Sequence, residues 1–242
     1  MTVADTRVFT AHAAVTAEPG PHGRTRLTRL RSDGPIALRE TPDGLYIVGA
    51  GAGPLGGDRL RLDIVVGAGA SLRIRSVAAA LALPGTAGEE SLFTIDARVR
   101  GHLDFAPEPT VAARGCLHRA VSEVRLGPDA TLRWSEELVL GRYGEEPGRH
   151  VSRLDVTRGD RPVLRHELRL DGSARSRAVL GDARAAGAVV RIGPGLTGTA
   201  LGGEGFGVMP LAAEGVLVTA LAADSAELRR RLEKGEQVLT GQ

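Results

Sequence analysis

The sequence predicts a mainly β protein whose antiparallel or mixed sheets are stacked in a solenoid-like arrangement. Two observations carry this prediction: short runs in which apolar and polar residues alternate, and glycine-rich turns that separate them. Alternation with a period of two is typical of strands that bury one face. The 33 glycines and 13 prolines are spread along the chain rather than gathered in a linker, so we expect a single domain over residues 1–242.

The expected strands share this alternation and end at turn residues. They are Leu45–Val48, Leu60–Val66, Ala70–Val77, Ser91–Val99, Val121–Leu126, Thr131–Leu140, Val151–Val156, Val163–Leu170 and Gly215–Ala222. Turns such as Gly127-Pro128-Asp129 and Asp171-Gly172 contain residues that suit tight turns. Short strands joined by such turns predict antiparallel pairing.

Two turn-and-strand segments resemble each other at an offset of 60 residues. Val66–Arg73 and Leu126–Arg133 share the same order of residue types, and a weaker copy, Val99–Leu103, lies about midway. A period of about 30 residues fits one hairpin or strand pair per unit, stacked so that each unit covers the apolar face of its neighbour. Such stacking builds a flat wall that suits the docking of other proteins. The alternative is that β turns simply look alike.

Helix is expected near the C-terminus and at one further place. In Ala223–Lys234, Asp224 or Ser225 can cap the first turn, two leucines lie four residues apart, and Gly235 follows as a stop signal. A second, short helix is expected near Asp182–Gly187.

Composition excludes several classes of function. The 31 Lys and Arg nearly balance the 29 Asp and Glu, so no basic stripe for nucleic acid is expected. Aromatic residues make up only 3% of the chain, too few for base-stacking surfaces. The single cysteine, Cys116, excludes an internal disulfide and favours a reducing compartment. No segment approaches the ~20 apolar residues of a membrane span, so we expect a cytoplasmic protein with neither nucleic-acid nor membrane partners.

Gly51–Gly56 matches the pattern G-x-G-x-x-G but does not predict nucleotide binding. A dinucleotide fingerprint needs a helix that begins at the glycines, and Pro54 with the strand-like Arg59–Val66 forbids one. The sequence contains neither a P-loop pattern nor the G-x-S-x-G of a serine nucleophile elbow. We therefore expect no catalytic activity from this chain.

Metal-ligating and acidic residues are scattered along the sequence. Cys116 and His118 would share one face of an extended segment and form a candidate metal pair, with a buried structural cysteine as the alternative. Glu136 and Glu137 are neighbours on a predicted strand, so their side chains should point to opposite faces. An inward Glu136 would need a partner such as Arg142 or a water-filled passage.

Two motifs, in order, carry a family resemblance. Leu55–Leu60 contains Gly-Gly-Asp-Arg-Leu, and Leu140-Gly141-Arg142 is preceded by Glu136 and followed by Gly144-Glu145. These segments are similar to the G-G-D-x-L and acidic-x-x-x-L-G-R...G-E motifs of the UreD (also UreH) urease accessory proteins. The resemblance covers residues 44–172 well and 213–234 loosely. Its motif residues with an expected structural role are Gly56, Gly57, Leu60, Leu140, Gly141 and Arg142.

The chain also departs from the family pattern, as a divergent member would. The departures lie in residues 49–53, 77–84 and 106–109, and His166 stands where the family has a glutamate. The contacts that the family makes through those groups therefore do not carry over.

The resemblance implies a non-enzymatic scaffold and metallochaperone. UreD-type proteins bind apo-urease and join a UreF-type helical protein and a UreG-type GTPase, and nickel is thought to pass through the β-rich subunit. Asp58, Glu136, His166 and Glu108 match polar positions of the family's proposed passage. The resemblance thus implies transient Ni²⁺ and no tightly bound cofactor. For Asp58, the alternative is that it caps its own turn.

Two other functions stay open at the level of sequence. One is a β-solenoid carbohydrate-active enzyme with Asp104 and Glu108 as its carboxylates, although sugar rings usually stack on aromatic residues that are scarce here. The other is a metal-free protein-binding β module.

Overall fold

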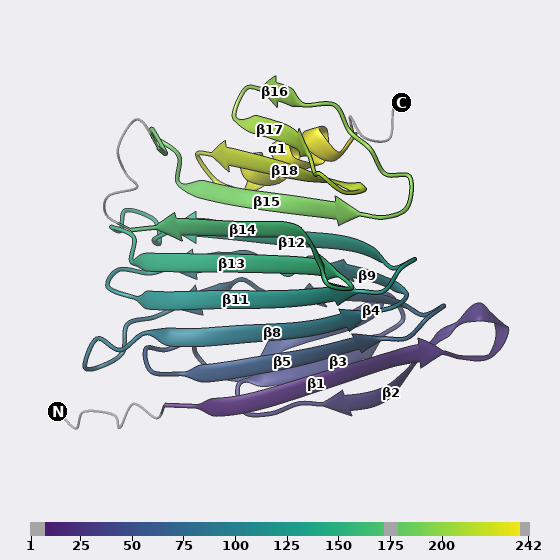
Figure 1. The fold of residues 1–242 in the computed structure, drawn as a ribbon. Coiled ribbons are helices and arrows are strands. Elements are labelled where there is room, and N and C mark those ends of the chain that lie inside the picture. Colours follow the sequence, from purple (N-terminus) through teal and green to yellow (C-terminus); the bar gives the residue numbers. More distant parts are fainter. Residues whose placement is uncertain (1–7, 172–178, 238–242) are drawn as a thin grey trace.

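The computed structural model describes residues 8–171 and 179–237, which form two mixed β-sheets with one α-helix. The sheets lie face to face, and residues from both of them form the main hydrophobic core (Figure 1). Trp134, which is fully buried, stacks on Phe105 in this core with 4.1 Å between the ring centroids. The expectation of a mainly β, solenoid-like protein is therefore confirmed.

The seven-stranded sheet has the order β14-β13-β11-β8-β5-β1-β2. Five of its neighbouring strands, β1, β5, β8, β11 and β13, run parallel, and β2 and β14 are added antiparallel at the two edges. Its strands are β1 (Thr10–Pro19), β2 (Thr25–Arg31), β5 (Arg59–Val66), β8 (Ser91–Val99), β11 (Leu117–Leu126), β13 (Arg149–Arg158) and β14 (Arg161–Leu170).

The second sheet has eleven strands, and its longest path is β16-β17-β18-β15-β12-β9-β6-β4-β3. Strands β4, β6, β9 and β12 are parallel neighbours, while β10 pairs with both β12 and β7. Its strands are β3 (Ile36–Thr41), β4 (Gly44–Gly49), β6 (Ser71–Ser76), β7 (Ala80–Ala82), β9 (His102–Phe105), β10 (Thr110–Ala112), β12 (Thr131–Leu140), β15 (Ala185–Ile192), β16 (Leu201–Gly203), β17 (Phe206–Pro210) and β18 (Gly215–Ala222). A short 3-10 turn, Pro21–Gly23, follows β1.

Successive coils of the chain add strands to both sheets in turn. The chain runs along β5, crosses to β6, returns along β8, crosses to β9, and repeats this path through β11 and β12. Ser71, His102 and Thr131 are paired in register on β6, β9 and β12. The two similar segments 60 residues apart in the sequence therefore lie on equivalent parts of the solenoid. The weaker copy lies on the coil between them.

The antiparallel pairing expected for the central strands is wrong. The glycine turns carry the chain from one sheet to the other instead of joining neighbours in one sheet, so strands that pair are a whole coil apart. Alternation of apolar and polar residues reports that one face is buried, and it does so for either strand direction.

The short helix expected near Asp182–Gly187 is also wrong. Residues 185–192 form β15, which pairs with β12 on one side and β18 on the other. Burial on both faces explains the small residues of this strand: Ala188 faces the main core, and Gly187 lies against Leu228 and Leu232 of the helix. The alanines of this strand allow close packing on both faces, but alanine also favours helices, and this led to the prediction of a helix.

Helix α1 (Ser225–Gln237) covers the outer face of the second sheet, where Leu228 and Leu232 pack against β15, β17 and β18. Asp224 caps it, because its Oδ1 accepts the backbone N–H of Glu227 at 2.8 Å. Gly235 does not end the helix as expected; it is a buried helical residue whose missing side chain leaves room for Val218. Within the described residues, no helix is both long and apolar enough to cross a bilayer.

Candidate functional site

Two adjacent cavities lie along the interior of the solenoid. The first, here called the loop cavity, has a volume of about 340 Å³, and its wall includes Asp58, Glu108 and His118. The second, the central cavity, has a volume of about 90 Å³ and lies between the inner faces of the two sheets, with Glu136 and His150 in its wall. Both cavities share four wall residues: Phe93, Phe105, Pro107 and Thr110.

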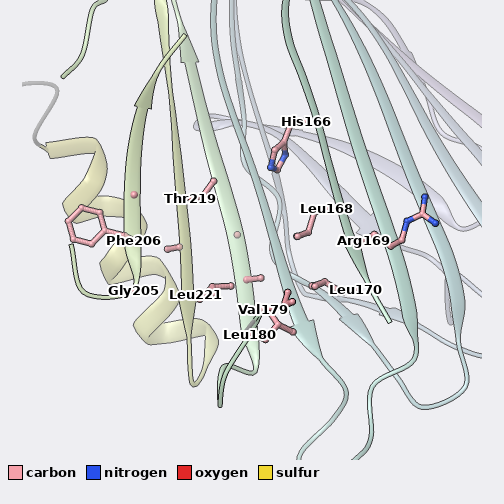
Figure 2. Close-up of a pocket in the computed structure, with 14 residues that line it drawn as sticks. His166, Leu168, Arg169, Leu170, Val179, Leu180, Gly205, Phe206, Thr219 and Leu221 are labelled. Atoms are coloured by element: carbon pink, nitrogen blue, oxygen red, sulfur yellow. The ribbon is translucent and has the colours of Figure 1, made fainter. Parts of the chain in front are cut away.

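A third cavity continues from the central one. This edge cavity has a volume of about 390 Å³ and lies beside β14, the last strand of the seven-stranded sheet. Figure 2 shows His166 and Leu168 of β14 on one side of it and Thr219 and Leu221 of β18 on the other. His166, Leu168 and Ala186 belong to the walls of both the central and the edge cavity, so the three cavities follow one another.

Asp58 holds the start of β5 through both of its carboxylate oxygens. Oδ1 accepts the backbone N–H of Phe9 at 2.8 Å, and Oδ2 accepts that of Leu55 at 2.9 Å. The residue is only 1% exposed. Asp58 therefore caps its glycine-rich turn, as the alternative interpretation of the sequence held, and it also lines the loop cavity.

Glu136 and Glu137 point to opposite faces of β12, as expected. Glu136 pairs in register with Ala188 on the core side, and its Oε1 accepts the indole N–H of Trp134 at 2.9 Å. Burial raises the pKa of Glu136, although hydrogen bonds from Trp134 and Ser152 oppose the shift. Glu137 lies on the helix side, where Arg229 Nε is 3.1 Å from its Oε2.

Arg142 is not the partner of Glu136. Its guanidinium binds Glu145 in a two-pronged pair, with Nε 2.9 Å from Oε2 and Nη2 2.8 Å from Oε1. Glu136 makes no ion pair with an arginine in the described part of the chain; Trp134 and Ser152 bind it by hydrogen bonds, and it lines the central cavity. Arg142 as its partner is therefore wrong, and a water-filled passage stays a prediction.

Glu108 and His166 lie at different points of the cavity series. Glu108 follows β9 and pairs with Arg229, whose Nη2 is 2.5 Å from Glu108 Oε2. His166 is partly buried on β14, and burial lowers its pKa, so the ring is neutral at physiological pH. The structure thus places Asp58 and Glu108 on the loop cavity, Glu136 on the central cavity and His166 between the central and edge cavities.

Cys116 and His118 lie close in sequence but in different environments. Cys116 is fully buried in an apolar cluster, and burial, with a smaller effect of Glu145, raises the pKa of its thiol to about 11. A thiol that keeps its proton is a weak metal ligand, since the thiolate is the ligating form. His118 lines the loop cavity instead, so a joint metal role for this pair stays a prediction.

His150 is a wall residue that the sequence interpretation missed. It pairs in register with His118 on the preceding coil, and the two ring centroids are 5.3 Å apart. Burial lowers the pKa of His118 to about 4 and that of His150 to about 3. The repeat of about 30 residues was the signal that could have found it, because it places residues 118 and 150 on neighbouring coils.

The carboxylates of the competing enzyme hypothesis are held in ion pairs. Asp104 accepts bonds from Arg75 at 2.5 Å and Arg133 at 3.3 Å; burial alone would raise the pKa of Asp104, but these arginines hold it below its usual value. Glu108 pairs with Arg229. The lowered pKa of Asp104 does not suit a proton donor, and both carboxylates are engaged by arginines, so the structure gives the carbohydrate-active hypothesis no support.

The first family motif forms a tightly packed turn before β5. A side chain at Gly56 would collide with the backbone of Gly85, and Gly57 has a φ of +95°, which favours glycine. Leu60 follows in the core. The pattern from Gly51 to Gly56 opens no helix; it connects β4 to β5 and lines the loop cavity.

The second motif forms the turn after β12. Leu140 is buried, Gly141 has a φ of +74°, and Arg142 closes the turn onto Glu145. Arg184 adds hydrogen bonds to the carbonyls of Leu140 at 2.7 Å and Glu145 at 2.9 Å. All six motif residues thus lie in turns or in the core, and Arg142 is the exposed one among them.

The three segments that depart from the family pattern meet at one place. Residues from 49–53, 77–84 and 106–109 all contribute to the wall of the loop cavity. The three segments expected to depart from the family pattern thus lie at the loop cavity, whereas the fourth departure, His166, lies between the central and edge cavities.

The fold and its cavities define a two-sheet β-solenoid with an apolar core, cavities that a few polar side chains line, and no nucleotide-binding loop in its described part. A family model described as UreD urease accessory protein matches residues 10–242. The urease accessory protein UreD of Parafrankia sp. (strain EAN1pec) is 43% identical over 96% of this chain and 89% of its own length. Those of Frankia casuarinae and Streptomyces avermitilis are 41% and 39% identical, over 93% and 97% of this chain and 88% and 98% of their own lengths. The chain belongs to the UreD family of urease accessory proteins, which confirms the family predicted from its motifs.

Proposed function

We propose that this protein is a non-enzymatic scaffold of urease maturation that also conducts nickel through its interior. One observation carries the nickel part: Asp58, Glu108, Glu136 and His166 line three cavities that follow one another through the solenoid. These four residues come from distant parts of the sequence. A core that served stability alone would not need polar side chains along a series of cavities, because burying polar groups is costly.

The chemistry of the cavity walls suits an ion that must leave again. Carboxylate oxygens and neutral imidazoles are ligands for Ni²⁺, and spaced single ligands hold it weakly. Among residues 8–171 and 179–237, no group of three or more His, Cys, Asp or Glu is placed to hold a metal ion. A conduit needs this arrangement, because a complete site would retain the ion.

The scaffold part of the proposal rests on the family and on the shape of the sheets. We propose that apo-urease, a UreF-type protein and, through that complex, a UreG-type GTPase are the partners, in the cytoplasm, where the free buried Cys116 would stay reduced. The outer face of the seven-stranded sheet carries ion-paired side chains, such as Asp96 with Arg125 at 2.8 Å, and this polar surface suits reversible protein contacts.

The experiment is co-expression with urease subunits and the other accessory proteins, followed by co-purification and by measurement of nickel in the matured urease. Glu136→Gln and His166→Leu, singly and together, should leave the complex intact and lower the nickel content several-fold. Asp58 is left unchanged in this test, because its two carboxylate oxygens each accept a backbone N–H and a substitution there would disturb the turn. Glu123→Gln is the matched control, since it alters an exposed carboxylate of β11 that lines none of the three cavities. Full nickel content in the double variant would remove the conduit, and failure of the native chain to co-purify would remove the scaffold.

A further inference from the structure

His118 and His150 form an unusual pair in the interior. They are in register on the parallel strands β11 and β13 and are 3% and 4% exposed. His150 Nδ1 is buried, and no residue in the described part of the chain forms a hydrogen bond with it. An unpaired buried polar atom is destabilising, so an apolar side chain would be favoured at this position if the ring served packing alone.

Ser91 engages one of the two ring nitrogens of His118. Its Oγ lies 2.9 Å from His118 Nδ1 and 3.4 Å from the carbonyl oxygen of Leu117. In the tautomer in which Ser91 accepts from Nδ1 and donates to that carbonyl, Nε2 of His118 keeps its lone pair for an ion. An imidazole held through its N–H by a neighbour is the usual arrangement of a metal-binding histidine.

The spacing of the two rings is within reach of a shared ion. With a metal–nitrogen distance of about 2.05 Å and about 1.15 Å from nitrogen to ring centre, two imidazoles on one ion place their centroids about 5.2 Å apart at a tetrahedral angle and about 4.5 Å apart at the right angle of an octahedral ion. The observed separation is 5.3 Å, so a tetrahedral ion fits the rings as they stand and an octahedral ion would draw them closer together. His118 belongs to the wall of the loop cavity and His150 to that of the central cavity, so the pair lies where one cavity gives way to the next.

We propose that His118 and His150 are a two-imidazole transfer point at which a divalent cation of borderline softness, such as Ni²⁺, passes between the loop cavity and the central cavity. This inference rests on the proposed conduit and names a site within it. Two ligands bind such an ion without enclosing it, and water fills the other coordination positions, so the ion exchanges readily.

The direct test uses the purified full-length chain with ¹⁵N-labelled histidine and Ni²⁺ alone. Paramagnetic Ni²⁺ should broaden the ring signals of His118 and His150 below one equivalent, before those of exposed rings. In His118→Gln, the broadening of His150 should fall several-fold, and the reverse should hold in His150→Gln. His102→Gln is the matched control, since that exposed ring binds Thr131 Oγ1 at 2.7 Å and should leave both signals unchanged. Sharp signals from both buried rings while exposed rings broaden would overturn the proposal.

A second test separates this site from the conduit as a whole. His150→Leu removes the unpaired nitrogen and should unfold at the same temperature or higher, so a folding defect does not confuse the result. Nickel in co-expressed urease should fall several-fold. If Glu136→Gln and His166→Leu lower nickel while His150→Leu does not, the transfer point is overturned and the conduit stands. If none of them lowers nickel, the conduit is overturned, and the ring signals still decide whether the pair binds Ni²⁺.

Discussion

Gly56 shows how little space the turns of the solenoid leave for a side chain. A Cβ at this position would meet the backbone of Gly85 and the carbonyl of Glu89, neither of which can rotate away. Gly56→Ala should therefore lower the free energy of unfolding by about 1–3 kcal/mol in urea titrations. Gly202→Ala is the matched control, because nothing lies within 4 Å of its Cβ position, and it should change stability by less than about 0.5 kcal/mol. Equal stability of the two variants would contradict this account.

The pair of Arg142 and Glu145 predicts a stability difference that depends on pH. Hydrogen bonds from Arg142 lower the pKa of Glu145 from 4.5 to about 2. A depressed carboxylate pKa contributes stability that is complete above the unfolded value and is lost as pH falls toward the folded value. Arg142→Met should therefore melt at a lower temperature than the native chain at pH 6, with the difference shrinking between pH 4.5 and pH 2. A difference that stays constant on acidification would show that the pair is not its source.

Single residues also mark the limit of what sequence could predict about the candidate site. The opposite orientation of Glu136 and Glu137 followed from strand geometry alone. His150 did not stand out, because its significance depends on register with His118 one coil away. The four polar residues of the proposed route came from the family resemblance, whereas their places along the three cavities depend on side-chain packing between the sheets.

At the scale of elements, helix α1 is held by a narrow apolar stripe. Leu228 is fully buried against β15 and β18. Leu228→Ala should lower the free energy of unfolding by about 2–5 kcal/mol, since truncation leaves a cavity that the sheet cannot fill. Glu233→Ala, on the exposed face of the same helix, should change it by less than about 0.5 kcal/mol. Chemical denaturation followed by circular dichroism measures both, and a smaller loss for Leu228→Ala than for the control would refute the packing role of the helix.

Strands were predicted well where exposed or half-buried residues alternate with buried ones, as in β5, whose start differs by one residue from the predicted Leu60–Val66. The bounds of Thr131–Leu140 (β12) and Gly215–Ala222 (β18) were also right, the latter because its valines and threonine favour a strand even where both faces are buried. The prediction failed at β15, because burial on both faces removes alternation and leaves a run of small residues. The alternating pattern also could not predict strand direction, since its period of two is the same in parallel and antiparallel pairs.

At the scale of the whole molecule, the conduit predicts that it can be blocked without unfolding the protein. Ala188 is 8% exposed and lines the central cavity of about 90 Å³. Ala188→Leu adds three carbon atoms there, so it should change the free energy of unfolding by less than about 1.5 kcal/mol. Nickel in co-expressed urease should nevertheless fall several-fold. The control Ala226→Leu adds the same atoms to the exposed face of α1 and should leave nickel unchanged; equal nickel in both variants would argue against an interior route.

The residue-for-residue register of neighbouring coils constrains how such a protein can evolve. Between β8, β11 and β13, each inward side chain lies directly over its counterpart on the coils before and after it. A one-residue insertion within any of these strands would turn every following inward side chain outward and expose the histidines and serines to solvent. Insertions are therefore tolerated in the bends between strands, or when they add one complete coil. Relatives of different length should differ in those two ways.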